Sequence, residues 1–217
     1  MEYILNAGNS EIVLKIIEAI HQNAEYLSEI DGATGDGDHG VNMNKGFLMA
    51  KERIMNKELS FAEAIKILGR TLIMDIGGSM GPIYGTMFNE FWKALKTTEK
   101  IQATDLLNAL NNSTTALMDL AGAKVGDKTL IDTIVPARDA FANALQEGKS
   151  FFESLEELSA GAEAGKENTK NMMAKIGRAA RLQERSIGFL DAGATSCCII
   201  LQTMASAMKG HIQNEEI

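Results

Sequence analysis

The chain has 217 residues, of which 45% are hydrophobic and 23% charged, as in an ordinary globular protein with a single domain over residues 1–217. Its net charge of −8 argues against a surface for nucleic acid or anionic membrane, so a phosphate ligand would need metal ions or backbone amides. Only two prolines occur among abundant Ala, Leu, Ile, Met, Glu and Lys, which favours an all-α fold.

The cysteines and the start of the chain bear on its location. Cys197 and Cys198 are adjacent in an apolar stretch, so we expect small buried side chains and not a disulfide or metal site. The N-terminus shows no signal-peptide pattern, and residues 192–208 are too short and too polar for a confident membrane span. We therefore predict a cytoplasmic protein.

Helical spacing of hydrophobic residues dominates the chain, and alternating strand patterns are nearly absent. The spacing predicts a first helix over roughly residues 9–30, with Ile12 and Ile16 on one stripe. Two Ser-x-x-Glu patterns, beginning at Ser60 and Ser150, predict capping boxes for the third and seventh helices. The remaining helices are predicted to begin near Met43, after Ser79, at Thr104, after Asp127 and after Gly193.

Eight helices fit an antiparallel up-and-down bundle or barrel. In such a bundle alternate loops share one end, which would bring together the loops that follow helices one, three, five and seven. All unusual glycine-rich or charged segments of the chain fall in these loops, so we predict a site at that end. The four loops are residues 31–42, 76–81, 122–129 and 178–193.

The first of these loops carries Asp31, Asp36 and Asp38, separated by glycines. Concentrated carboxylates on a bent backbone repel one another unless a cation neutralises them, and magnesium prefers such oxygen ligands. The alternative is an acidic solvent loop with Asp-Gly turns. The spacing favours a metal site, and it does not fit an EF-hand.

The other loops predict contacts to a phosphate-bearing ligand. Ser79 follows paired glycines at the start of a helix, where free amides attract anions, although an ordinary turn is the alternative. Asp127 could simply cap the sixth helix, and Lys128 could simply be solvated. Arg178 could bind a nucleotide phosphate or order its own loop. His39 could be a metal ligand, a general base or a nucleotide contact, and the oxygen preference of magnesium favours the contact.

Four motifs occur in order over nearly the whole chain, and together they resemble the L subunits of bacterial dihydroxyacetone kinases. The resemblance implies an eight-helix barrel with a nucleotide at one end. The motifs are Gly35-Asp36-Gly37-Asp38-His39-Gly40 with Asp31 and Asn42, Gly77-Gly78-Ser79-Met80-Gly81-Pro82, Gly126-Asp127-Lys128-Thr129 and Glu184-Arg185-Ser186-Ile187-Gly188.

The resemblance also implies a set of site residues. Asp31, Asp36 and Asp38 would hold two magnesium ions that bridge to the phosphates of ADP or ATP, and they would act in catalysis. The remaining residues implied to line the nucleotide site are His39, Asn42, Ser79, Met80, Leu130, Arg178, Asp191 and Gly193.

The same resemblance implies partners. ADP would stay bound as a cofactor and be rephosphorylated by the M subunit, a phosphohistidine protein of the phosphotransferase system. The γ-phosphoryl group would then pass to dihydroxyacetone on a partner K subunit, because this chain contains no K domain. A homodimer remains open.

Several residues depart from the family pattern near the last motif. Phe189 stands where a histidine is common, Ala192 where a proline is common, and Gln183 where a glycine is common. Ala121 likewise replaces a frequent glycine. These changes fit a paralogue that serves another ketose or polyol, and they leave a non-catalytic nucleotide-binding regulator as the alternative.

Overall fold

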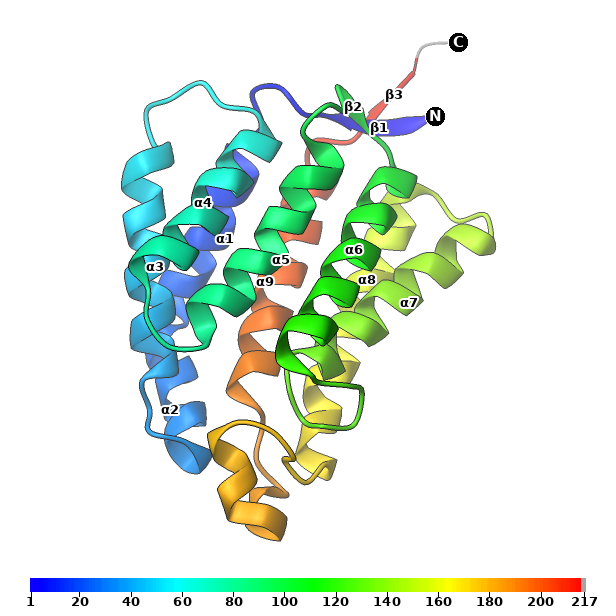
Figure 1. The fold of residues 1–217 in the computed structure, drawn as a ribbon. Coiled ribbons are helices and arrows are strands. Elements are labelled where there is room, and N and C mark those ends of the chain that lie inside the picture. Colours follow the sequence, from blue (N-terminus) through cyan, green and yellow to red (C-terminus); the bar gives the residue numbers. More distant parts are fainter. Residues whose placement is uncertain (216–217) are drawn as a thin grey trace.

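The computed structural model describes residues 1–215. Figure 1 shows a barrel of helices, which confirms the predicted all-α class. The described elements are β1 (Glu2–Leu5), α1 (Glu11–Gln22), α2 (Ala24–Thr34), α3 (His39–Ile54), α4 (Phe61–Asp75), α5 (Met80–Leu95), β2 (Lys100–Ile101), α6 (Ala103–Ala121), α7 (Ile131–Gln146), α8 (Phe151–Asn168), the 3₁₀ segments η1 (Thr169–Asn171) and η2 (Arg178–Ser186), α9 (Ala192–Lys209) and β3 (Gln213–Asn214).

The helices form a closed ring. Consecutive helices from α3 to α9 pack against one another, and α9 returns to lie against α1. Because the direction alternates, the segments that follow α2, α4, α6 and α8 meet at the lower end in Figure 1, as predicted. No helix within residues 1–215 is long and apolar enough to cross a membrane.

The predicted first helix is two helices, which makes nine α-helices in the described chain instead of eight. The break falls at Asn23, whose backbone leaves the helical region at φ −101° and ψ 9°. Its side-chain amide donates a hydrogen bond to the carbonyl of Ala19 at 2.8 Å and so ends α1 locally. Asparagine competes in this way for backbone groups. The second of these helices, α2, continues through Asp31, which was predicted to lie in a loop.

The helix starts predicted at Ser60, at Ser150 and after Ser79 are confirmed, whereas the cap predicted at Thr104 is wrong. Ser60 and Ser150 each form a capping box with the glutamate three residues on. The cap of α6 is formed between Gln102 and Asp105, so Thr104 lies inside the helix. Ser79 makes no side-chain capping bond at the start of α5.

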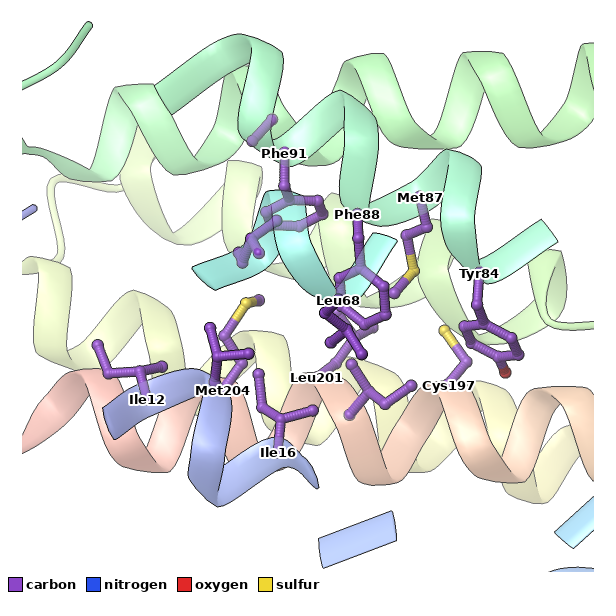
Figure 2. Close-up of a cluster of buried hydrophobic side chains, with 14 of the residues drawn as sticks. Ile12, Ile16, Leu68, Tyr84, Met87, Phe88, Phe91, Cys197, Leu201 and Met204 are labelled. Atoms are coloured by element: carbon purple, nitrogen blue, oxygen red, sulfur yellow. The ribbon is translucent and has the colours of Figure 1, made fainter. Parts of the chain in front are cut away.

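One hydrophobic core fills the barrel. Figure 2 shows Ile16 of α1, Leu68 of α4, Phe88 of α5 and Leu201 of α9 converging in it. Each such side chain contributes about 1.5–3 kcal/mol when it is fully buried. Both cysteines are buried on α9 and form no disulfide, as predicted.

A small antiparallel sheet, which the sequence did not predict, lies at the end away from the four loops. β1 is its central strand and pairs with β2 and β3. Two of these strands have only two residues, too few for an alternating pattern to be visible. The sheet holds the described N- and C-terminal segments side by side (Figure 1).

The start of α3 packs on α2 through Gly40. A Cβ atom at this position would collide with the carbonyl oxygen of Ala24 and lie 2.6 Å from the Ser28 hydroxyl. The helix itself begins at His39, four residues earlier than the predicted Met43. The close packing at Gly40 also fixes α2 and α3 relative to each other, and the acidic loop connects these two helices.

We expect Gly40→Ala to lower the free energy of unfolding by about 1–3 kcal/mol, because overpacking forces backbone shifts. Gly32→Ala is the matched control in α2, since a Cβ there meets only Gly37 Cα at 3.9 Å. It should raise stability by up to about 1 kcal/mol through helix propensity. Urea unfolding of both variants measures the difference, and equal stabilities would contradict the packing argument.

Candidate functional site

A cavity of about 500 Å³ opens where the four loops meet. Residues from all four loops line it, so the predicted gathering of the loops at one end is confirmed. The lining includes every residue predicted for the site: Asp31, Asp36, Asp38, His39, Asn42, Ser79, Met80, Leu130, Arg178, Asp191 and Gly193.

The three aspartates form a compact acidic cluster. Asp31, from the last turns of α2, is half-buried, whereas Asp36 and Asp38 are exposed on the loop that follows. One carboxylate oxygen of each lies within 4.8 Å of the others. Gly37, at φ 77°, takes the left-handed conformation that the tight turn requires. The glycines noted in the sequence therefore bend the chain so that the carboxylates converge.

The chemistry of this cluster fits a hard divalent cation. Its donors are all carboxylate oxygens, the ligands that magnesium prefers, and they face the cavity, where water and phosphate can complete the coordination. Arg178 of η2 forms an ion pair with Asp36 across the cavity mouth. The positive charge predicted for this acidic end is thus supplied by the segment between α8 and α9.

His39 is held by a chain of hydrogen bonds that the sequence did not reveal. Its Nε2 lies 2.9 Å from the hydroxyl oxygen of Ser196 on α9, which lies 2.5 Å from the hydroxyl oxygen of Tyr84 on α5. The Tyr84 hydroxyl also donates to the carbonyl of Gly193 at 2.9 Å. Burial lowers the pKa of His39, although the nearby Asp31 carboxylate opposes the shift. These hydrogen bonds orient the imidazole of His39 at the cavity wall.

Tyr84 is buried in the core. A buried tyrosine hydroxyl needs a hydrogen-bond partner, as does the buried hydroxyl of Ser196. Polar hydroxyl groups within apolar helices were therefore the feature of the sequence that could have indicated a buried hydrogen bond. The sequence could not show that α5 and α9 bring them together.

The start of α5 offers exposed backbone to the cavity. A Cβ atom at Gly77 or Gly78 would meet no atom within 4 Å, and Gly78 has φ 76°. Ser79 and Met80 line the cavity immediately afterwards, at a helix start whose first amides have no partner within the helix. This arrangement can bind an anionic group closely.

The structure excludes both simple alternatives considered for the third loop. Asp127 does not cap α7, since its carboxylate accepts from the N–H of Lys124 at 2.9 Å. Asp132 accepts from the N–H groups of Gly126 and Thr129 at 2.6 and 2.8 Å. Lys128 is not solvated: only 1% of its surface is exposed, and its ammonium group donates to backbone carbonyls. The sequence could not distinguish a buried lysine from a solvated one.

Asp191 caps α9 at the inner wall of the cavity. Its carboxylate accepts a hydrogen bond from the N–H of Ala194 at 2.7 Å, and burial raises its pKa to about 6. A Cβ atom at Gly193 would lie 3.1 Å from this carboxylate and 3.7 Å from the amide nitrogen of Leu130. The glycine therefore lets the start of α9 approach the loop that carries Leu130.

The fold and the site together define a helical barrel whose loop end presents acidic and anion-binding groups around one cavity. Residues 33–206 match the family described as the DAK2 domain, and the chain belongs to this family. Membership confirms the resemblance that the four motifs indicated.

Individual relatives agree. The chain is 35% identical over 189 residues to the PEP-dependent dihydroxyacetone kinase, ADP-binding subunit DhaL, of Escherichia coli, covering 86% of this chain and 89% of that one. It is 28% identical over 189 residues to the L-erythrulose kinase of Pectobacterium atrosepticum, covering 86% of this chain and 32% of that one. Its fold matches the crystal structure of the dihydroxyacetone kinase from C. freundii in complex with AMP-PNP and Mg²⁺, with a TM-score of 0.71 and 22% identity, covering 91% of this chain and 33% of that one.

Asp191 should give stability a distinctive pH dependence. Because its folded pKa of about 6 exceeds the unfolded value of 3.8, the folded state retains a proton that the unfolded state has lost. Stability from this group is therefore full below pH 4 and is lost as pH rises towards 6. Relative to Asp191→Asn, which keeps the cap, wild-type stability should fall by about 1–3 kcal/mol across this window.

The measurement is urea unfolding of metal-free protein between pH 4 and 7. Asp119→Asn, at an exposed carboxylate of α6, is the control and should keep the wild-type pH slope. The same slope in Asp191→Asn and the wild type would show that Asp191 is not the group that titrates.

Proposed function

We propose that this chain is the nucleotide-binding subunit of a cytoplasmic dihydroxyacetone kinase. It would transfer the γ-phosphoryl group of ATP to dihydroxyacetone held on a partner K subunit. A phosphohistidine protein of the phosphotransferase system, the M subunit, would regenerate this ATP from tightly bound ADP. The observation that carries the proposal is the convergence of the acidic cluster, the open start of α5 and Arg178 on one cavity.

Two magnesium ions would be held by Asp31, Asp36 and Asp38. Bound there, they would supply charge neutralisation for the β- and γ-phosphates. The backbone at Gly77 and Gly78 leaves room for a phosphate to approach the first amides of α5.

Other residues of the chain would position the nucleotide. Arg178 would release Asp36 and bind phosphate oxygens through its guanidinium group, which suits bidentate contacts. His39, fixed by Ser196, would contact the nucleotide without a covalent role. The remaining proposed contacts are Asn42, Ser79, Met80, Leu130, Asp191 and Gly193.

A second candidate is an ATP-dependent kinase subunit for another ketose or polyol. Phe189 is 45% exposed beside the site, and Ala192 lines the cavity, at positions where the family commonly has histidine and proline. The similarity to an L-erythrulose kinase supports this candidate as well. A non-catalytic nucleotide-binding regulator is a third candidate, motivated by the same changes.

The nucleotide content of the purified protein tests the first proposal. The chain is purified without added nucleotide, dialysed exhaustively with magnesium present, denatured, and its released nucleotide is identified by chromatography. Near-stoichiometric ADP is the expected result. An empty protein that binds ATP reversibly would favour the second candidate, and one that binds no nucleotide would overturn all three.

Asp36→Asn should abolish phosphoryl transfer in the presence of the K and M partners, lowering kcat by at least about 100-fold, since preorganised charge carries such catalysis. It should also remove the stabilisation that magnesium gives to the wild type, which is about 2.7 kcal/mol at 100 times Kd and is measured as a rise in melting temperature.

Asp119→Asn, at an exposed position outside the cavity lining, should leave both readouts unchanged. Full phosphoryl transfer by Asp36→Asn would show that the metal assignment is wrong. If only the magnesium-dependent rise persisted in that variant, the other two aspartates would suffice to hold the ion.

A further inference from the structure

Lys128 is the buried charged group whose role the proposed chemistry leaves unexplained. Its ammonium nitrogen donates to the carbonyl oxygens of Met172 at 3.2 Å, Ser186 at 2.5 Å and Phe189 at 2.7 Å. An ammonium group has three donors, so these bonds use all of them. Burial lowers the pKa of Lys128, and the nearby Asp191 carboxylate opposes the shift. Lys128 also lines the cavity, but backbone carbonyls already accept from all three donors of its ammonium group.

The three carbonyls lie on both sides of η2. Met172 precedes this segment, whereas Ser186 ends it and Phe189 follows it. Arg178, which pairs with Asp36 of the acidic cluster, begins the same segment. One side chain therefore ties together the two ends of the stretch that crosses the cavity mouth.

The loop that carries Lys128 is itself rigidly placed. Lys128 has φ 62°, a left-handed conformation that is unfavourable for a residue with a Cβ atom. The carboxylate of Asp132 in α7 holds the amides on either side, at Gly126 and Thr129. The left-handed backbone at Lys128 and the two hydrogen bonds to Asp132 fix the loop, so that the lysine side chain reaches the carbonyls of the segment.

Other ties join the segment to the rest of the chain: the N–H of Gly188 donates to the carbonyl of Lys170 at 2.7 Å, and Ile176 packs against the core. Lys175 donates its backbone N–H to the Asp127 carbonyl and pairs with the Asp127 carboxylate at 3.4 Å. The bonds of Ser186 to Ala174 and Gln183 are internal to the segment. Opening of the segment would leave the ammonium group of Lys128 without its three carbonyl partners, which is unfavourable for a buried charge, so the lysine resists that opening.

We propose that Lys128 is a positioning residue that anchors residues 172–189 across the cavity and thereby holds Arg178 over the acidic cluster. This inference rests on the proposed nucleotide site, whose bound ADP the anchored segment would retain. Without the anchor, the segment opens more often, Arg178 loses its fixed place and the nucleotide leaves faster. Lys128 acts on the nucleotide only through this segment.

Lys128→Met tests the anchor, because methionine has a similar length and no donor. In nucleotide-free protein, trypsin cleavage after Arg181 and Arg185 should accelerate at least tenfold. Release of ADP from the loaded protein should also accelerate at least tenfold. Lys124→Met is the matched control in the same loop, where the side chain is exposed, and it should change neither rate.

A double-mutant cycle with Arg178→Ala tests the route of action. If Lys128 acts through Arg178, the double variant should release ADP no more than about twice as fast as Arg178→Ala alone. Independent, multiplicative effects would overturn the positioning role. Faster release in Lys128→Met with unchanged trypsin cleavage would make Lys128 a direct ligand contact and also overturn it.

The wild-type chain provides a test in case Lys128→Met does not fold. Reductive methylation of amines, read by peptide mass spectrometry, should label Lys128 at least tenfold more slowly than Lys124. Lys128 should become reactive over the same urea range in which Arg181 becomes cleavable, because both report release of the segment. Reactivity of Lys128 while Arg181 stays protected would overturn the anchor.

Failure of the proposed function has a different signature. If the wild-type chain binds no ADP, the segment cannot serve to retain that nucleotide. The comparison of trypsin cleavage between Lys128→Met and Lys124→Met needs no nucleotide, so it would still decide whether the lysine anchors the segment.

Discussion

Mutual repulsion of three carboxylates is the constraint on which the loop end of this barrel depends. Two like charges about 4 Å apart repel by about 1 kcal/mol in water and about 4 kcal/mol near a protein surface. Asp31, Asp36 and Asp38 are nevertheless held within 4.8 Å of one another. The close packing of α3 on α2 at Gly40 fixes both ends of their loop, and Arg178 supplies opposing charge from across the cavity. The carboxylates are thus held close together by the fold itself, which is what the proposed cation site requires.

The closed ring of helices converts this local constraint into a complete site. Each of the four loops contributes a different kind of group: carboxylates, open helix amides, an anchoring lysine and an arginine. Polar contacts between Tyr84, Ser196 and His39 link α5, α9 and α3 at the cavity wall. A binding site spread over four loops can be this precise only because the helices below them are tightly packed.

Local patterns in the sequence correctly predicted those features that depend on residues close together along the chain. The capping boxes at Ser60 and Ser150, the alternation of loops and the candidate metal ligands belong to this group. The break at Asn23 was missed because a single asparagine outweighed a continuous apolar stripe. The burial of Lys128 and the contact of Ser196 with Tyr84 join residues far apart in sequence, and no spacing rule reports such contacts. Whether the cavity lining binds nucleotide stays a prediction.

The small sheet has a consequence for how this barrel can be combined with other modules. It places β1 and β3 together at the end of the barrel remote from the cavity (Figure 1). A helix such as α9, with 18 residues, spans about 27 Å between these two ends. A module joined at either strand would therefore start about one barrel length from the cavity. A long tether or a separate chain could deliver an acceptor to the cavity, whereas a short direct fusion could not.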